Sequence, residues 1–184
     1  MNDAELIQGC LKDDRRCQNA LYKKYYPLMS SIALRYSVSE EEAMQHINFG
    51  FLKAMKNLSS YRAEFAFATW IRNILIHHII DENRKNKKYT DIIQVSSIEE
   101  IMPGSDVNFG EQKLEEIDVL DLLRKLPETS RKVFTLFAID GFKHAEIAKL
   151  LGISEGTSKW HVNEARKRLT EILNTQSNKV IKAS

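Results

Sequence analysis

The segment from Phe142 to Leu173 holds two helical patterns separated by a turn of a few residues, and this spacing limits the folds open to the chain. In the first pattern, His144–Leu151, the apolar residues share one helix face. Gly152 can adopt the positive φ that ends a helix, and Ser154 is placed to cap the next one. The second pattern repeats small or apolar residues at helical spacing, namely Ser158, Val162, Ala165, Leu169 and Ile172. The segment is therefore predicted to be a helix-turn-helix.

The other face of the second predicted helix is rich in hydrogen-bonding side chains: Thr157, Lys159, Trp160, His161, Asn163, Glu164 and Arg166. One polar helix facing outward from a compact helix pair is typical of a helix that enters the DNA major groove. The alternative is a helical hairpin whose polar face is merely solvated. The length of the pair, the turn glycine and the serine cap favour DNA recognition.

The rest of the chain predicts an all-α protein. Seven glycines and three prolines in 184 residues are few, and the apolar residues recur mostly at helical spacing. We expect a helix over residues 3–11, a longer one through Tyr36, a third from a capping-box Ser39 to about Lys56, and a fourth from about Phe67 to Arg84. The segment 59–66 has no helical pattern and is predicted to be a loop.

The composition divides the chain into two helical domains. From Tyr89 to about Gly110 there is no clear period and several acidic residues occur, so this segment is predicted to be a flexible linker. The fold expected is all-α, with two small helical domains, the second a helix-turn-helix or winged-helix-like DNA-binding domain. The predicted boundaries are 1–88 for the first domain, 89–110 for the linker, 111–175 for the second domain and 176–184 for a polar, frayed tail.

The charge and the motifs exclude several classes of function. A net charge of +2 is too small for a generally basic surface, so any affinity for nucleic acid must come from local clusters or from a partner. No phosphate-binding glycine loop, metalloprotease motif or nucleophile motif occurs. We therefore expect no enzyme activity, no cofactor and no small-molecule substrate.

Cysteine and histidine positions predict no metal site. Cys10 and Cys17 lack metal-ligand spacing and are expected to be reduced, buried thiols. The adjacent His77 and His78 point to different helix faces, while the remaining histidines, His46, His144 and His161, are scattered. The chain shows no secretory signal and no apolar run long enough for a bilayer, so it is predicted to be cytoplasmic, without membrane insertion.

Two segments together resemble a known family. LPETSRKVFTLFAIDGFKHAEIAKLLGISEGTSKWHVNEARKRL resembles the C-terminal, region 4 domain of bacterial sigma factors of the extracytoplasmic-function (ECF) branch of the sigma-70 family. LYKKYYPLMSSIALRY, FLKAM and FATWIRNILIHHIIDENRKNKK resemble their N-terminal, region 2 domain. The resemblance implies an RNA polymerase sigma factor, with core RNA polymerase, promoter DNA and an anti-sigma factor as partners. The alternative is a stand-alone helix-turn-helix regulator that binds DNA without being a polymerase subunit.

The resemblance implies that the first domain melts the minus-ten promoter element and captures unpaired bases. Aromatic side chains stack on such bases while cations hold the phosphates. The residues expected there are Tyr61, Arg62, Phe65, Arg84, Lys85, Lys87 and Lys88. Phe67 and Trp70 lie on the apolar stripe and are predicted to belong to the core. The basic run could instead be a solvated helix end.

The second domain of the family recognises the minus-thirty-five element with the second helix of its helix-turn-helix. In this chain the resemblance assigns that role to Thr157, Lys159, Trp160, His161, Asn163, Glu164 and Arg166. Glu164 departs from the family, in which a basic residue is usual at this position. Its carboxylate could accept a hydrogen bond from cytosine N4, or it could remain at a distance from the DNA phosphates.

The third helix departs further from the family pattern. Members carry an acidic, amide-rich string close to DAEDLVQEVFL, which meets a basic coiled coil of the largest polymerase subunit, whereas this chain has EAMQHINFGFL. The predicted polymerase-binding residues are Glu42, Gln45, Asn48, Phe49 and Leu52. We expect a more apolar binding surface than usual, unless Phe49 rotates into the core.

Overall fold

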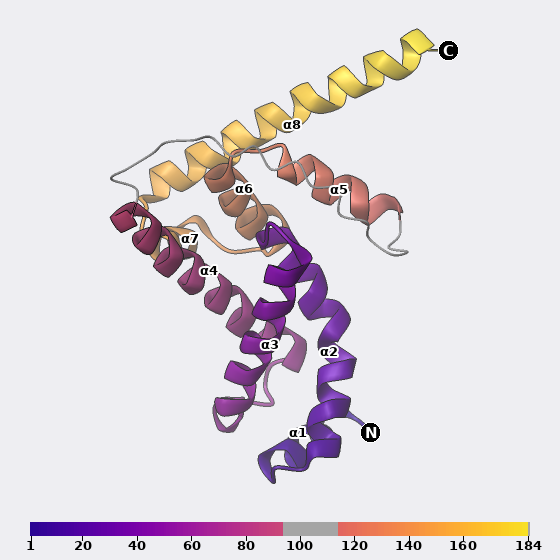
Figure 1. Cartoon of the computed structure of the whole chain (residues 1–184), viewed down its shortest axis with the longest axis vertical. Helices are drawn as coiled ribbons and strands as arrows, with labels where there is room; N and C mark the ends of the chain where they lie inside the picture. Colours follow the sequence, from indigo (N-terminus) through magenta and orange to yellow (C-terminus); the bar gives the residue numbers. More distant parts are fainter. Residues whose placement is uncertain (94–113, 184) are drawn as a thin grey trace. The chain divides into compact units, whose positions relative to one another are not determined.

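The computed structural model describes residues 1–93 and 114–183. The chain divides into two compact units, Met1–Val107 and Asn108–Ser184. Every regular element within the described ranges is helical, which confirms the all-α prediction (Figure 1). Since no strand occurs in the described part of the second unit, its helix-turn-helix carries no wing there. Most of the predicted linker, from residue 94 on, lies outside the described residues.

The described part of the first unit contains four α-helices: α1 (Asp3–Leu11), α2 (Arg15–Tyr36), α3 (Glu40–Lys56) and α4 (Phe67–Ile93). A 3₁₀ turn, η1 (Leu58–Ser60), follows α3. Ser39 caps α3 as predicted, because its Oγ accepts from the Glu42 N–H at 3.2 Å. The Glu42 carboxylate accepts from the Val38 N–H at 2.7 Å. Both bonds fix the point at which the chain enters α3.

The core of the first unit lies between α2, α3 and α4. Its largest fully buried side chains are Leu21, Met29, Ile32, Ile47, Phe67, Ile71, Leu75, Ile76 and Ile79. Each contributes roughly 1.5–3 kcal/mol by leaving water. Gly50 permits the close approach of α3 to α4, since a Cβ there would lie 2.5 Å from Leu75 Cδ1. The helix pair that carries loop 61–66 is therefore held rigidly.

The fourth helix is longer than the sequence predicts. It continues beyond Arg84 to Ile93 and so includes the first residues of the predicted linker. No glycine or proline interrupts this stretch, and the first such residue is Pro103. In the absence of a stop signal the helical hydrogen bonds simply continue.

The second unit contains α5 (Leu114–Arg124), α6 (Glu128–Phe134), α7 (His144–Leu151) and α8 (Glu155–Ala183), as Figure 1 shows. A π-helical turn, η2 (Thr135–Ile139), extends α6. The core combines Leu123, Leu126, Val133, Leu136, Ile147, Val162 and Ala165.

The helix-turn-helix has the predicted local structure. Gly152 has φ +68° and ends α7 at the predicted residue. Ser154 Oγ accepts from the Thr157 N–H at 2.9 Å and so caps α8. The predicted frayed tail is different: α8 continues to Ala183 because the tail, like the end of α4, contains no glycine or proline.

Candidate nucleic-acid interface

The polar face of α8 is largely exposed, as predicted. Trp160 is 58 % exposed, and Thr157, Lys159, Asn163 and Arg166 are exposed beside it. The opposite face of α8 is anchored in the core through Ser158, Val162 and Ala165. The fold therefore offers a continuous row of hydrogen-bonding side chains on a well-anchored helix.

His161 is the first exception to this outward arrangement. It is half-buried, and its Nδ1 lies 3.0 Å from Ser130 Oγ of α6. Burial lowers the pKa of the His161 imidazole below its ordinary value. The ring is therefore neutral at pH 7, and one of its nitrogens is already engaged inside the protein.

Glu164 is the second exception. Its Oε1 accepts from Arg168 Nε at 2.6 Å, one helical turn away. This hydrogen bond holds the pKa of the Glu164 carboxyl below its ordinary value. A carboxylate at this position is thus paired within α8, and its negative charge is offset before any phosphate approaches.

Arg166 is steered by an aromatic stack. Its guanidinium carbon lies 5.9 Å from the centroid of the Phe137 ring in the π-helical turn. Phe137 in turn stacks on His144, with centroids 4.4 Å apart and planes inclined by 16°. The π-helical turn therefore supports the Arg166 cation on the exposed side of α8.

The loop between α3 and α4 contains a packed aromatic group and an exposed tip. Tyr61 meets Phe67 and Trp70 edge-on, at centroid distances of 5.3 and 5.4 Å, and its hydroxyl donates to the Phe65 carbonyl at 2.6 Å. Phe67 is buried, as predicted. Phe65 is 63 % exposed and Arg62 is exposed. Tyr61 thus orders the loop, while the other two predicted residues face solvent.

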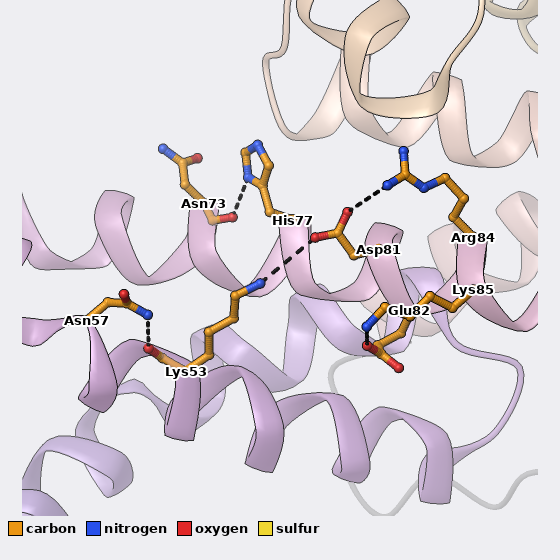
Figure 2. Close-up of polar contacts among 8 residues, drawn as sticks. All are labelled: Lys53, Asn57, Asn73, His77, Asp81, Glu82, Arg84 and Lys85. Atoms are coloured by element: carbon orange, nitrogen blue, oxygen red, sulfur yellow. Dashed lines mark hydrogen bonds and ion pairs between the residues drawn. The ribbon is translucent and has the colours of Figure 1, made fainter.

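A groove beside this loop was not predicted. It has a volume of about 390 Å³ and is lined by Lys53, Asn57, Ser60, Trp70, Asn73, Ile74 and His77. Figure 2 shows how its polar groups are held: the Asn57 amide donates to the Lys53 carbonyl and the His77 Nδ1–H donates to the Asn73 carbonyl, both at 2.7 Å. Its residues come from α3, η1, α4 and the residue Asn57 that joins α3 to η1, so only helix packing brings them together. The spacing of Asn73 and His77, one helical turn apart, was the available signal.

The basic run in the C-terminal half of α4 is partly paired with acids on the same helix. Arg84 Nη2 lies 3.9 Å from Asp81 Oδ1, and Lys85 Nζ donates to Glu82 Oε1 at 2.8 Å (Figure 2). The hydrogen bond with Lys85 lowers the pKa of the Glu82 carboxyl. These exposed pairs are weak, so phosphates could still compete for the cations. The side chains of Lys87 and Lys88 lie outside the described part of the structure.

Between Met44 and Leu52 the outward face of α3 is uncharged and partly apolar, and the exposed Glu41, Lys53 and Lys56 flank this stretch. Phe49 is 60 % exposed and Leu52 is 50 % exposed, so the alternative in which Phe49 enters the core is wrong. Gln45 and Asn48 are exposed one helical turn before Phe49 and Leu52, respectively, and Asn48 Oδ1 accepts from Tyr22 Oη at 3.0 Å. Glu42 is half-buried and engaged at the helix start. Within the described residues, this face has the character of a protein-binding surface.

His46, one of the histidines predicted to be scattered, packs against a histidine of another helix. His46 of α3 and His78 of α4 meet edge-on, with ring centroids 5.6 Å apart. No group of three or more histidine, cysteine, aspartate or glutamate side chains suited to a metal ion occurs among the residues searched, those that the structure describes. No helix in the same part of the chain is long and apolar enough to cross a membrane.

Comparison with known protein families identifies the family to which this chain belongs. The family model described as Sigma-70 region 2 matches residues 21–89, and the model described as Sigma-70, region 4 matches residues 116–169. The chain belongs to the sigma-70 family. This sigma factor is 26 % identical over 172 residues to the ECF RNA polymerase sigma factor SigM of Mycobacterium tuberculosis H37Rv, covering 94 % of this chain and 85 % of SigM. It is also 26 % identical over 180 residues to the ECF sigma-E factor of Escherichia coli K12, covering 92 % of this chain and 93 % of sigma-E.

These matches confirm the prediction of an ECF RNA polymerase sigma factor and do not favour a stand-alone regulator. Core RNA polymerase and promoter DNA are accordingly its partners. Among solved structures, CnrH in complex with the cytosolic domain of CnrY covers 94 % of this chain and 97 % of CnrH, with a TM-score of 0.52 and 21 % identity. RpoE of Bartonella quintana, solved with the anti-sigma factor NepR, covers 84 % of this chain and 97 % of RpoE, with a TM-score of 0.54 and 22 % identity. At such identities the likeness concerns the fold.

Proposed function

We propose that this sigma factor holds a promoter at two points, with the first domain on unpaired minus-ten bases and the second on the minus-thirty-five duplex. The observation that carries the proposal is the groove between α3 and α4, whose lining residues Ser60 and Trp70 stand on either side of loop 61–66 in the sequence. Arg62 and Phe65 of that loop are exposed. The matched segments 21–89 and 116–169 support the proposed domains 1–88 and 111–175.

The groove is suited to a flipped base. Asn57 and Asn73 can donate to and accept from the edge of a base, and Trp70 lines the same groove with an aromatic surface. Lys53 contributes a cation at the rim, although it lies 3.9 Å from Asp81 Oδ2. Phe65 can stack on a neighbouring base, for which a stabilisation of roughly 1–3 kcal/mol is typical.

On α8, the exposed side chains are suited to base edges and phosphates in the major groove. Lys159 and Arg166 can contact phosphates or guanine, Asn163 can pair with adenine, and Trp160 can pack on a thymine methyl group. Glu164 does not need a cytosine partner, because Arg168 already occupies its carboxylate.

For the α3 face we propose binding to core polymerase with little dependence on charge. Gln45, Asn48, Phe49 and Leu52 are exposed and uncharged. Contacts made by such residues are screened little by salt, in contrast to contacts between acidic and basic surfaces. The affinity for core polymerase should therefore change little between low and high salt.

We further propose that the protein acts in the cytoplasm as a regulatory subunit without enzymatic activity. An anti-sigma partner is proposed as well. RpoE, which has the same fold as this protein, was solved in complex with the anti-sigma factor NepR, and this supports the proposal. Such a partner would hold the factor away from polymerase until a signal releases it.

A gel-shift assay with promoter fragments tests the proposal. The protein with core polymerase should shift the DNA strongly, and the protein alone weakly or not at all, because its net charge of +2 offers few phosphate contacts. Asn57→Ala should reduce opening of the minus-ten element, as detected by reactivity of unpaired thymines, while leaving binding to core polymerase unchanged. Unchanged opening in Asn57→Ala, Asn73→Ala and Phe65→Ala variants would contradict the role given to the groove.

A further inference from the structure

Ser130 lies behind the recognition helix and is 3 % exposed. It belongs to α6, outside the helix-turn-helix, and no sequence pattern connects it with DNA. Its Oγ lies 3.0 Å from Nδ1 of His161 on α8. A hydroxyl that is buried and bonded to a half-buried ring restricts the rotation of that ring.

The two nitrogens of an imidazole point in widely different directions, since one ring carbon separates them. With Nδ1 directed toward Ser130 of α6, Nε2 is directed away from that hydroxyl. Trp160 packs edge-on against the same ring at a centroid distance of 4.9 Å and supports this orientation. Because the ring is neutral at pH 7, one nitrogen carries the proton and the other accepts, so Nε2 takes the role opposite to the one that Nδ1 takes toward Ser130 Oγ.

We propose that Ser130 is a positioning residue for promoter recognition: it fixes the His161 ring so that Nε2 makes a hydrogen bond to the minus-thirty-five element. The proposal rests on the proposed function of α8. It makes His161 a determinant of base preference that acts as a neutral hydrogen-bonding group, unlike the cations Lys159 and Arg166. It also gives α6 a part in specificity that its position outside the helix-turn-helix would not indicate.

Two substitutions that affect different nitrogens of the His161 ring separate promoter recognition from protein stability. His161→Asn places an amide near the position of Nδ1, where it can still bond Ser130, but leaves nothing at the position of Nε2. Ser130→Ala removes the hydroxyl and leaves the ring free to rotate. The measurement is the base preference at each minus-thirty-five position, obtained by transcription with core polymerase and the full chain on promoters randomised there.

Both variants should relax the preference at the same position by about two- to tenfold, the effect of one hydrogen bond. The double variant should show no further loss, because the two residues act as one unit. Ser130→Thr, which keeps the hydroxyl, should retain most of the preference.

Ile147→Val is the matched control. It removes one methyl group from a fully buried side chain of α7 in the core of the same domain. Its thermal unfolding midpoint should fall about as much as that of Ser130→Ala, with the base preference intact. If Ser130→Ala or His161→Asn keeps the wild-type preference at every position, the proposal is overturned. If the wild type itself has no minus-thirty-five preference, the proposed function of α8 fails instead.

Discussion

Phe49 and Phe65 offer a matched pair of substitutions that separates polymerase binding from promoter opening. Both lie in the first unit and have nearly the same exposure, 60 % for Phe49 on α3 and 63 % for Phe65 on the loop. Truncation of either removes the same atoms from the surface. We predict that Phe49→Ala weakens binding to core polymerase and that Phe65→Ala does not.

The magnitude follows from the exposed area. A phenylalanine presents about 200 Å² in total, so 60 % exposure leaves about 120 Å² of Phe49 available to a partner. At about 25 cal/mol per Å² this corresponds to about 3 kcal/mol if the contact is complete. A partly covered ring would give about 2 kcal/mol, or roughly a thirtyfold increase in Kd.

Binding of labelled sigma factor to core polymerase, followed by fluorescence anisotropy at low and high salt, measures this effect. The increase in Kd for Phe49→Ala should be similar at both salt concentrations, because the lost contact is apolar. Thermal unfolding monitors folding of the variants, and Leu52→Arg should act in the same direction as Phe49→Ala. Wild-type affinity in both Phe49→Ala and Leu52→Arg would refute the assignment of this surface to polymerase.

Three further predictions concern stability and charge. Gly50→Ala should lower the free energy of unfolding by about 1–3 kcal/mol in denaturant melts, because a Cβ overpacks the α3–α4 contact. Burial and the neighbouring His46 lower the pKa of His78. Because the folded protein disfavours the protonated His78 ring, this contribution to stability is fully present above the ordinary pKa of about 6.5 and is lost as the pH falls from there through the lowered pKa. A His78→Gln variant should flatten this dependence of stability on pH between pH 5 and 8. Arg168→Ala should weaken minus-thirty-five binding by exposing the Glu164 carboxylate, and adding Glu164→Gln should restore it, as measured by gel shift with core polymerase.

The helix-turn-helix could be predicted from sequence because its determinants are local. Gly152 and Ser154 act within one turn of their positions, and the apolar spacing of α7 and α8 matches the burial observed. The ends of α4 and α8 could not be predicted in the same way. Both were placed where the apolar stripe ends, but a helix continues through polar residues until a stop signal interrupts it.

The parts of the site that depend on packing escaped prediction. Asn57 and Asn73 are separated in sequence and line one groove only because α3 and α4 pack against each other around Gly50. The helical pattern also predicts that His161 lies on the outward face, but one of its ring nitrogens, Nδ1, lies within hydrogen-bond distance of Ser130 on another helix. Periodicity determines the face on which a residue lies, but it does not identify the neighbour that the side chain bonds.

The central claim is that this protein directs core polymerase to promoters with two recognition elements. Mapping of transcription start sites on a genomic library, with core polymerase alone and with the sigma factor added, tests it most directly. New start sites should appear that share a minus-ten and a minus-thirty-five element at constant spacing, and the upstream element should be lost in a Lys159→Ala variant. Start sites identical to those of core polymerase alone, or new start sites without a shared upstream element, would contradict it.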